Sequence, residues 1–213
     1  MGSTQFWIRT GNSLLKAERF LRRMFPRKAS NAHIADRNYS FNNERNIRAL
    51  TVNDQLDGKS TGVSSLKLGD TVMKNSGCEV IATYNALLLY GKQVSVAGAA
   101  KRFEENGCLV RFPFVRYGAL GVNPYDIGQI VASYGVNCST VSVEQMCEPG
   151  IYILSYWNDA RLLSGIHTIA VHTRNGMCYM YNYTMKGNTG FGVFPSAFVK
   201  PFRDSYVTGY KLR

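Results

Sequence analysis

The sequence predicts an α+β domain in which helices come first along the chain and antiparallel strands follow. The helical segments are residues 80–90, 94–107 and 123–135, and the strand segments are residues 150–157, 167–173 and 177–183. Such segregation is typical of α+β domains, whereas parallel α/β sheets alternate helix and strand along the chain. The chain has 213 residues, 45% of them hydrophobic, so it is long enough to bury one sizeable core.

The basic character of the chain is concentrated at its N-terminus. Residues 1–50 hold ten Lys and Arg against three acidic residues, whereas residues 51–213 hold fifteen against eleven. The first part therefore contributes +7 and the second +4 to the formal charge of +11. We divide the chain accordingly into a basic N-terminal extension, residues 1–50, and a folded domain, residues 51–213.

One amphipathic helix is expected within the extension. Asn12 or Ser13 can cap it, and Pro26 ends it after Phe25. Its apolar stripe consists of Leu14, Leu15, Ala17, Leu21, Met24 and Phe25. Two interpretations stay open. Through residues 9–28 the helix binds an anionic membrane surface, an acidic partner or nucleic acid, or its apolar stripe packs on the folded domain. Because no nucleic-acid-binding motif of recognisable spacing is present, nucleic acid is the least expected partner.

Cap residues bound the helical segments of the folded domain. Residues 27–76, which precede these segments, are rich in Asn, Ser, Asp and Gly and predict mostly loop with one or two short elements. Residues 80–90 are apolar enough for a buried helix, which Gly91 closes. The caps of the other two helices are Ser95 with Gly107, and Pro124 with Gly135.

Two of the strand segments are expected to form a hairpin. All three segments are rich in β-branched and aromatic residues. The last two are separated by Asn-Gly at residues 175–176, which is the strongest short signal for a two-residue hairpin loop. In that register Arg174 pairs with Met177, and Asn182 lies diagonally across from His167 on the same face of the hairpin.

The position of Cys78 indicates chemistry. It follows Gly77 at the start of the helix predicted over residues 80–90, where the positive end of the helix dipole and unpaired N–H groups stabilise a thiolate. The N–H of Cys78 itself can bind a developing oxyanion. The other four cysteines are interpreted as buried structural residues, and they are Cys108, Cys138, Cys147 and Cys178.

A thiolate nucleophile needs an imidazole, and the three histidines differ in position. His33 lies in the polar N-terminal region, and His172 lies in the middle of a strand, on the face opposite to His167. His167 opens its strand, where a side chain can reach over the end of the sheet. Asn182 is within reach of its imidazole and can fix the orientation of the ring, as a third residue does in nucleophilic sites. The sequence therefore predicts a catalytic set of Cys78, His167 and Asn182.

No cofactor and no export signal are indicated. The chain has no CxxC or CxH pairing that would hold zinc, and we expect no metal or other cofactor. Residues 1–30 contain no uninterrupted apolar segment of the signal-peptide type, and no run reaches the length of about 18 apolar residues of a transmembrane helix. Five cysteines without framework spacing favour a reducing compartment, so we expect a cytoplasmic location.

The segment SGCEVIATYNALLLYG resembles the nucleophile helix of bacterial papain-like cysteine peptidases, in particular the stand-alone relatives of the double-glycine peptidases that process bacteriocin leaders. Gly77, Cys78 and Glu79 open this segment, and Gly91 closes it after a Leu-rich turn. Four later segments are similar to successive elements of the same family: SVAGAAKRF, NPYDIGQIVASYGV, PGIYILSYW and GIHTIAVHTRNGMCYMYN. The resemblance covers residues 70–185.

The resemblance implies a papain-like fold with the nucleophile helix packed on an antiparallel sheet. It implies Cys78 as nucleophile, His167 as general base and Asn182 as the residue that orients the imidazole. The function that follows is a cysteine-dependent hydrolase, a peptidase or isopeptidase, that forms a thioester acyl-enzyme with a peptide or protein substrate. An acyltransferase or amidase on the same fold is the near alternative.

One departure from the family concerns the oxyanion hole. Papain-like enzymes usually carry a glutamine about six residues before the cysteine, and this sequence has Val72 there. Asn75 is the candidate replacement, and Gln55 and Asn53 are more remote ones. The missing glutamine favours a second alternative from another class, a catalytically retired papain-like fold that binds a partner through its basic N-terminal arm.

Overall fold

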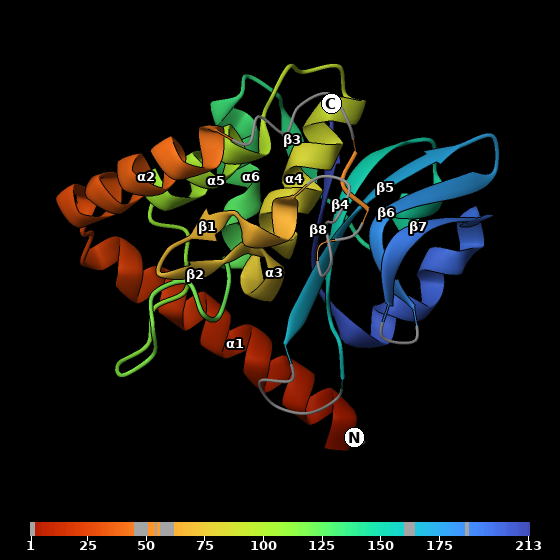
Figure 1. Ribbon diagram of the computed structural model, residues 1–213. Helices are drawn as coiled ribbons and strands as arrows, with labels where there is room; N and C mark the ends of the chain where they lie inside the picture. Colours follow the sequence, from red (N-terminus) through yellow and green to blue (C-terminus); the bar gives the residue numbers. More distant parts are fainter. Residues whose placement is uncertain (1–2, 45–50, 54, 56–61, 160–164, 186–187) are drawn as a thin grey trace.

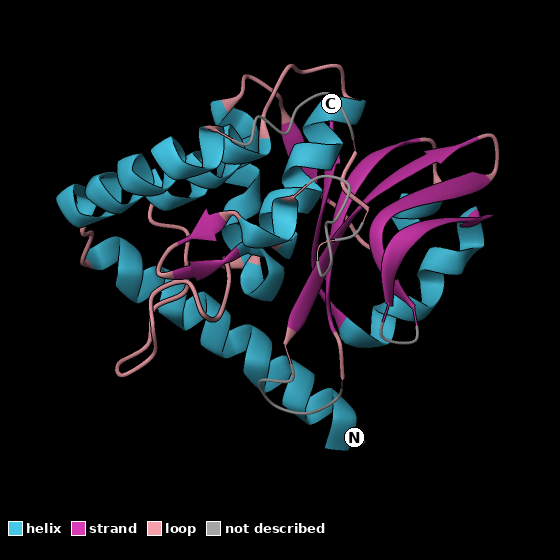
Figure 2. Ribbon diagram, viewed as in Figure 1, coloured by secondary structure: helices cyan, strands magenta, loops and turns pink. Residues whose placement is uncertain are grey.

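The computed structural model describes residues 3–44, 51–53, 55, 62–159, 165–185 and 188–213. Most of the helices gather on one side of the molecule, and a six-stranded antiparallel sheet lies on the other (Figures 1 and 2). The predicted combination of helices with an antiparallel sheet is confirmed.

The helices lie mainly in the N-terminal two thirds of the chain. They are α1 (Ser3–Met24), α2 (Lys28–Asn43), α3 (Met73–Ser76), α4 (Cys78–Leu89), α5 (Val96–Glu105) and α6 (Ile127–Ser133). Within the described ranges, 3-10 segments accompany them, and these are η1 (Val63–Ser65), η2 (Pro124–Asp126), η3 (Glu144–Cys147) and η4 (Ser196–Ser205). The three helical segments predicted for the folded domain are thus confirmed as α4, α5 and the pair η2–α6.

The strands form two sheets. A small one pairs β1 (Lys67–Leu68) with β2 (Thr71–Val72). The large sheet consists of β3 (Cys138–Thr140), β4 (Gly150–Trp157), β5 (Ile166–Arg174), β6 (Met177–Met185), β7 (Asn188–Pro195) and β8 (Tyr206–Leu212). Its order is β3-β8-β4-β5-β6-β7, so the C-terminal strand is inserted next to β4. The three predicted strands are its neighbouring members β4, β5 and β6.

The predicted hairpin between β5 and β6 is confirmed at its loop. Arg174 pairs with Met177, and the residues between them, Asn175 and Gly176, both have positive φ, 51° and 72°. Two such residues are what a type I′ loop requires. The pairing continues only as far as Ala170 and Tyr181, where β6 departs from β5.

The large sheet is covered on both faces. On one face α4 packs on β4, β5 and β6, and the core there includes Ile153 and Ala170. On the other face η3 and η4 enclose a second core, which includes Leu154 and Val171. Every residue of α4 from Cys78 to Leu87 is buried, as its continuous apolar composition predicts.

The helix α2 occupies part of residues 27–76, where mostly loop is predicted, so that prediction is wrong for this segment. Its buried residues recur at helical spacing, and they are Asn31, Ala35, Asn38 and Asn42. The Asn42 amide pairs with the N–H and the carbonyl of Lys67 at 2.7 and 2.9 Å, and Asn38 donates to Glu104 at 2.6 Å. A stripe of asparagines carries no apolar periodicity, so an apolar pattern does not reveal the helix.

The helix α1 begins at Ser3, well before the cap predicted at Asn12 or Ser13. The Asn12 side chain accepts a hydrogen bond from Trp157 Nε1 at 2.9 Å and donates to the carbonyl of Tyr206 at 3.2 Å. Asn12 therefore attaches the helix to the sheet instead of capping it. The approach is close at the neighbouring Gly11, where a Cβ atom would lie 2.6 Å from the Trp157 ring.

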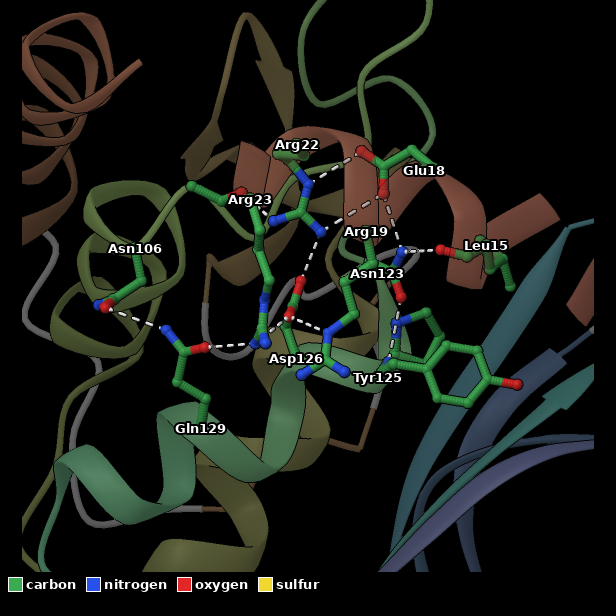
Figure 3. Close-up of polar contacts among 12 residues, drawn as sticks. Leu15, Glu18, Arg19, Arg22, Arg23, Asn106, Asn123, Tyr125, Asp126 and Gln129 are labelled. Atoms are coloured by element: carbon green, nitrogen blue, oxygen red, sulfur yellow. Dashed lines mark hydrogen bonds and ion pairs between the residues drawn. The ribbon is translucent and has the colours of Figure 1, made fainter. Parts of the chain in front are cut away.

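An ion network makes a second contact between α1 and the domain (Figure 3). The carboxylate of Asp126, which is only 1% exposed, accepts from Arg19 Nε at 2.6 Å and from Arg23 at 3.3 Å. Arg22 lies between the two acids and contacts both Asp126 and Glu18. Glu18 is buried and is the acidic residue of α1 itself.

The apolar stripe predicted for this helix does not make the contact. Among its six residues only Leu15 is partly buried against the domain, beside Ile8 and Trp157. The other five side chains are exposed: Leu14, Ala17, Leu21, Met24 and Phe25. Of the two open interpretations, the one in which this stripe packs on the folded domain is therefore wrong for five of its six residues, because the helix is held by the ion network and by Ile8 and Leu15 instead.

None of the helices in the described ranges is both long enough and apolar enough to cross a bilayer. Within the same ranges no group of three or more His, Cys, Asp or Glu side chains is arranged to hold a metal ion.

Candidate active site

Cys78 is the first residue of α4. Gly77 separates α3 from α4, and its φ of −102° and ψ of 11° interrupt the helical path. A side chain could not be accommodated there, because a Cβ atom on Gly77 would lie 2.0 Å from Met73 Sδ and 2.8 Å from the Met73 carbonyl. The glycine thus allows α3 to turn tightly into α4, and this turn sets the position of Cys78.

The sulfur of Cys78 contacts the main chain next to His167. Its Sγ is 3.5 Å from the carbonyl oxygen of Ile166, the residue before His167, and 3.3 Å from Glu79 Oε2. Helix α4 thereby meets the beginning of β5. In the described part of the chain the imidazole of His167 is not itself a hydrogen-bond partner of Sγ.

Glu79 is a buried carboxylate beside the thiol, 3% exposed. Burial raises the pKa of Glu79 to about 7, although N–H groups of the main chain and the hydroxyl of Thr168 favour its charged form. The carboxyl thus titrates near neutrality and is a direct electrostatic neighbour of Cys78.

The thiol form of Cys78 is favoured in this environment. Burial raises the pKa of the thiol well above its ordinary value, and the charge of Glu79 raises it further. Main-chain N–H groups of Glu79 and Thr168 lower the pKa but do not compensate. The stabilisation of a thiolate expected from the helix terminus is therefore outweighed, and the resting group is an S–H.

His167 is held by a main-chain carbonyl. Its Nε2 lies 2.6 Å from the carbonyl oxygen of Asn182, which can only accept, so Nε2 carries a proton and Nδ1 of the neutral ring is the free base. The ring packs edge-on against Tyr156 at 5.8 Å between centroids and is 7% exposed. Burial lowers the pKa of His167, and the bond to Asn182 opposes that shift.

The imidazole and the thiol approach β5 from opposite faces of the sheet. His167 pairs with Tyr156 across β4 and β5, on the face that η4 covers, whereas α4 covers the face that carries Ala170. The thiol contacts β5 at the Ile166 carbonyl, in the stretch of β5 from which β6 has departed. Because β6 does not pair with β5 there, Cys78 at the N-terminus of α4 can reach the main chain beside His167.

Asn182 contacts His167, but through its backbone and not through its side chain. The residue has a left-handed φ of 58°, and the β6–β7 pairing shifts register next to it. Its side chain turns to Gln55, which donates its main-chain N–H to Asn182 Oδ1 at 3.0 Å and accepts from Asn182 Nδ2 at 3.1 Å. This pairing fixes the strained backbone whose carbonyl holds the imidazole.

The oxyanion candidate Asn75 lies on the exposed side of α3, and its amide donates to Thr71 Oγ1 at 3.3 Å. The buried Gln55 is nearer to the set, because it joins Asn182 to the segment before Cys78. Its Nε2 donates to the carbonyls of Met73 at 3.1 Å and Lys74 at 3.3 Å. Both amide hydrogens are thus occupied in this arrangement.

Two residues of the site have roles that the sequence does not predict. Glu79 is part of the Gly-Cys-Glu segment and Gln55 is one of the remote oxyanion candidates, but neither is predicted as a neighbour of the thiol or of Asn182. The apolar neighbours of Glu79 in a buried helix are the signal that could have marked it as a buried acid. Gln55 has no local signal, because its role depends on a contact across 127 positions of the chain.

No protein-family model matches the chain, and no curated protein sequence matches it. Among solved structures the chain is similar to the crystal structure of the Pseudomonas avirulence protein AvrPphB, with 10% sequence identity and a TM-score of 0.37. That similarity covers 64% of this chain and 90% of the other. A likeness at this level carries no functional conclusion, and none of these comparisons connects the chain with the bacteriocin-leader peptidases.

Proposed function

We propose that the protein is a cysteine-dependent hydrolase with a papain-like set of Cys78, His167 and Asn182, acting on a peptide or isopeptide bond. The observation that carries the proposal is the contact of the Cys78 sulfur with the main chain at Ile166. In this contact a cysteine at a helix N-terminus touches the residue before His167, whose Nε2 is held by the carbonyl of Asn182. A nucleophile, a base and a group that fixes the base are the parts that covalent acyl transfer requires.

The reaction begins with a neutral Cys78 thiol and a neutral His167 imidazole. The thiol leaves the Ile166 carbonyl and gives its proton to Nδ1 of His167 as Sγ bonds to the substrate carbonyl carbon. The carbonyl electrons move onto oxygen, which the N–H of Cys78 stabilises. Collapse breaks the C–N bond, and His167 protonates the leaving amine. Water then attacks the thioester, its proton passes through His167 back to sulfur, and the carboxylic acid leaves.

The second oxyanion donor is assigned to Asn75 or Gln55. Asn75 is free to reorient because it is exposed and bonds only weakly to Thr71. Gln55 would have to release the carbonyl of Met73 or Lys74. Replacing each by alanine distinguishes them, because loss of one donor of this kind lowers kcat by about 100-fold or more.

The test of the proposal is cleavage of casein and of a quenched-fluorescent peptide library, followed by the release of amino groups. Cys78→Ala and His167→Gln should abolish turnover while the thermal melt stays within a few degrees. Cys108→Ala is the matched control, because Cys108 is also buried and also has a raised thiol pKa, and it should retain turnover. Turnover by Cys78→Ala would exclude the proposed nucleophile.

A catalytically retired fold that acts as a binding module is the second candidate. It is favoured by the burial of both groups, since Cys78 is 5% and His167 7% exposed, and by the raised pKa of the thiol. A substrate carbonyl reaches Sγ only after this arrangement opens. Absence of turnover in every substrate pool, with amine and alcohol acceptors added to detect acyl transfer, would favour the binding module.

A further inference from the structure

The helix α1 is turned with its apolar side away from the protein. Phe20, Leu21, Met24 and Phe25 are 64%, 56%, 59% and 74% exposed. In an ordinary surface helix the apolar side packs inward and the polar side faces solvent. Here Glu18 and Arg22 face the domain instead, and the apolar side has no partner among the described residues.

The exposed apolar residues of α1 gather on one side of the helix. At 100° per residue, positions 6, 14, 17, 20, 21 and 24 fall within an arc of about 120°, whose centre lies about 130° around the helix from that of the inner positions 11, 15, 18 and 22. The face is formed mainly by the second half of α1, from Leu14 to Met24, in a helix of 22 residues that is about 33 Å long. Figure 1 shows α1 along the outer margin of the molecule.

A second apolar element lies beside this face. The loop between α5 and η2 exposes Phe112, Phe114 and Val115, and Phe114 is fully exposed with a left-handed φ of 65°. It appears as the yellow-green loop that projects beside α1 in Figure 1. A cavity of about 1500 Å³ lies between the loop and α1 and is lined by residues of both.

Basic residues border the apolar face along one flank and at its C-terminal end, and acidic ones are absent from the exposed side of α1. The exposed cations are Arg9, Lys16, Arg23, Arg27 and Lys28, together with Arg116 in the loop. The acidic residue of α1, Glu18, is buried in the contact with the domain. An apolar face bordered by cations complements a surface that is both apolar and anionic.

We propose that α1 and the loop around Phe114 form a docking surface for an anionic phospholipid bilayer, with the apolar face inserted among the headgroups and the basic residues on the phosphates. A flat bilayer surface can cover the whole apolar face at once. A peptide lying in the cavity would leave Phe20 and Met24 uncovered, because neither lines it. The proposal does not depend on the catalytic assignment of Cys78.

The experiment is cosedimentation of the protein with vesicles of phosphatidylcholine alone or with about 30% phosphatidylserine. Binding is expected only to the anionic vesicles, and it should weaken as salt rises. Trp7 gives a second readout. It lies on α1 and is 40% exposed, whereas Trp157 is buried, so a blue shift on binding reports insertion of α1.

Two double variants, each with a control, separate the contribution of apolar insertion from that of electrostatic attraction. Phe20→Gln/Met24→Gln should reduce binding at least about tenfold, whereas Phe191→Gln/Val193→Gln, which removes exposed apolar residues from β7, should not. Arg27→Glu/Lys28→Glu should also reduce binding by about tenfold or more. Its control Lys200→Glu/Arg213→Glu changes the net charge equally at exposed positions elsewhere and should bind as the wild type does.

Three results would overturn the proposal. The first is no binding of the wild type to anionic vesicles. The second is full binding by Phe20→Gln/Met24→Gln, which would mean that attraction is purely electrostatic. The third is a dimer in sedimentation velocity that the same apolar variant converts to monomer, which would mean that a second copy of the chain covers the face.

Discussion

Glu79 opposes ionisation of the residue next to it. Its carboxylate is 3.3 Å from the Cys78 sulfur, and its charge is the second largest cause, after burial, of the raised pKa of that thiol. Because the pKa of Glu79 is about 7, its effect on the sulfur is switched on as pH rises through neutrality. The pKa of the Cys78 thiol is therefore highest above neutral pH, where Glu79 is charged.

Glu79→Gln is predicted to lower the pKa of the Cys78 thiol, because it removes the negative charge and keeps an amide of the same shape. Alkylation of Cys78 by iodoacetamide should become about three- to tenfold faster at pH 8 and should change little at pH 6, where Glu79 is already protonated. The readout is peptide mass mapping over time. Glu104→Gln is the matched control, since Glu104 is equally buried, has a pKa of about 7 and lies on α5.

The two buried glutamates also predict how stability depends on pH. Burial raises the pKa of Glu79 and of Glu104 from 4.5 to about 7, so folding favours their protonated forms. Their contribution to stability is complete below pH 4.5 and is lost as pH rises through 7, with a slope of at most about 1.4 kcal/mol per pH unit for each group. Urea unfolding of the wild type should show this decline between pH 5 and 8, and Glu79→Gln/Glu104→Gln should remove most of it. Equal slopes in the two proteins would contradict the assignment.

The residues of the site differ in how well the sequence predicts them. Cys78 and His167 follow from local patterns, a helix start and a strand start. The way Asn182 acts does not, because its left-handed backbone interrupts the hairpin register and presents a carbonyl to the imidazole. Positive φ at a strand residue depends on the long-range partner that stabilises it, and for Asn182 that partner is Gln55. No local sequence pattern identifies such a partner.

The attachment of α1 depends on Asp126. Three arginines of the helix converge on this buried carboxylate, so removing its charge leaves them without their counterion. Asp126→Asn is predicted to lower the free energy of unfolding by about 3 kcal/mol, measured in urea. Asp70→Asn removes one partner of an ion pair in which both side chains are about half exposed, and it should cost less than about 1 kcal/mol. Similar losses in the two variants would mean that the network does not hold the helix.

The sequence predicts the helices and strands whose apolar periodicity is strong. It does not predict those in which buried polar side chains or glycines interrupt that periodicity. Helix α4 and strands β4 to β6 are apolar and continuous. Helix α2 is built on buried asparagines, and β7 and β8 contain glycines that dilute the strand pattern. The apolar residues of α1 are a stronger case, because the pattern predicts a helix correctly and yet indicates the wrong side for packing.

Segments far apart in the sequence are joined in the sheet, in the attachment of α1 and in the candidate site. The C-terminal strand β8 enters the sheet between β3 and β4, α1 closes one end of the domain through Asp126, and Gln55 joins Asn182 to the segment before Cys78. Whether the basic N-terminal 50 residues form a unit apart from residues 51–213 stays a prediction. The contacts of α1 and α2 with the rest indicate that deleting them would remove part of the folded domain as well as its basic charge.

The central claim is that His167 takes the proton of Cys78. The most direct measurement is the rate of Cys78 alkylation by iodoacetamide from pH 5 to 9, read by mass mapping, in the wild type and in His167→Gln. We predict that the wild type reacts at least about tenfold faster at pH 7 to 8, and that its advantage disappears on acidification through the pKa of the imidazole, which burial lowers from its ordinary value. Identical profiles in the two proteins would contradict the claim.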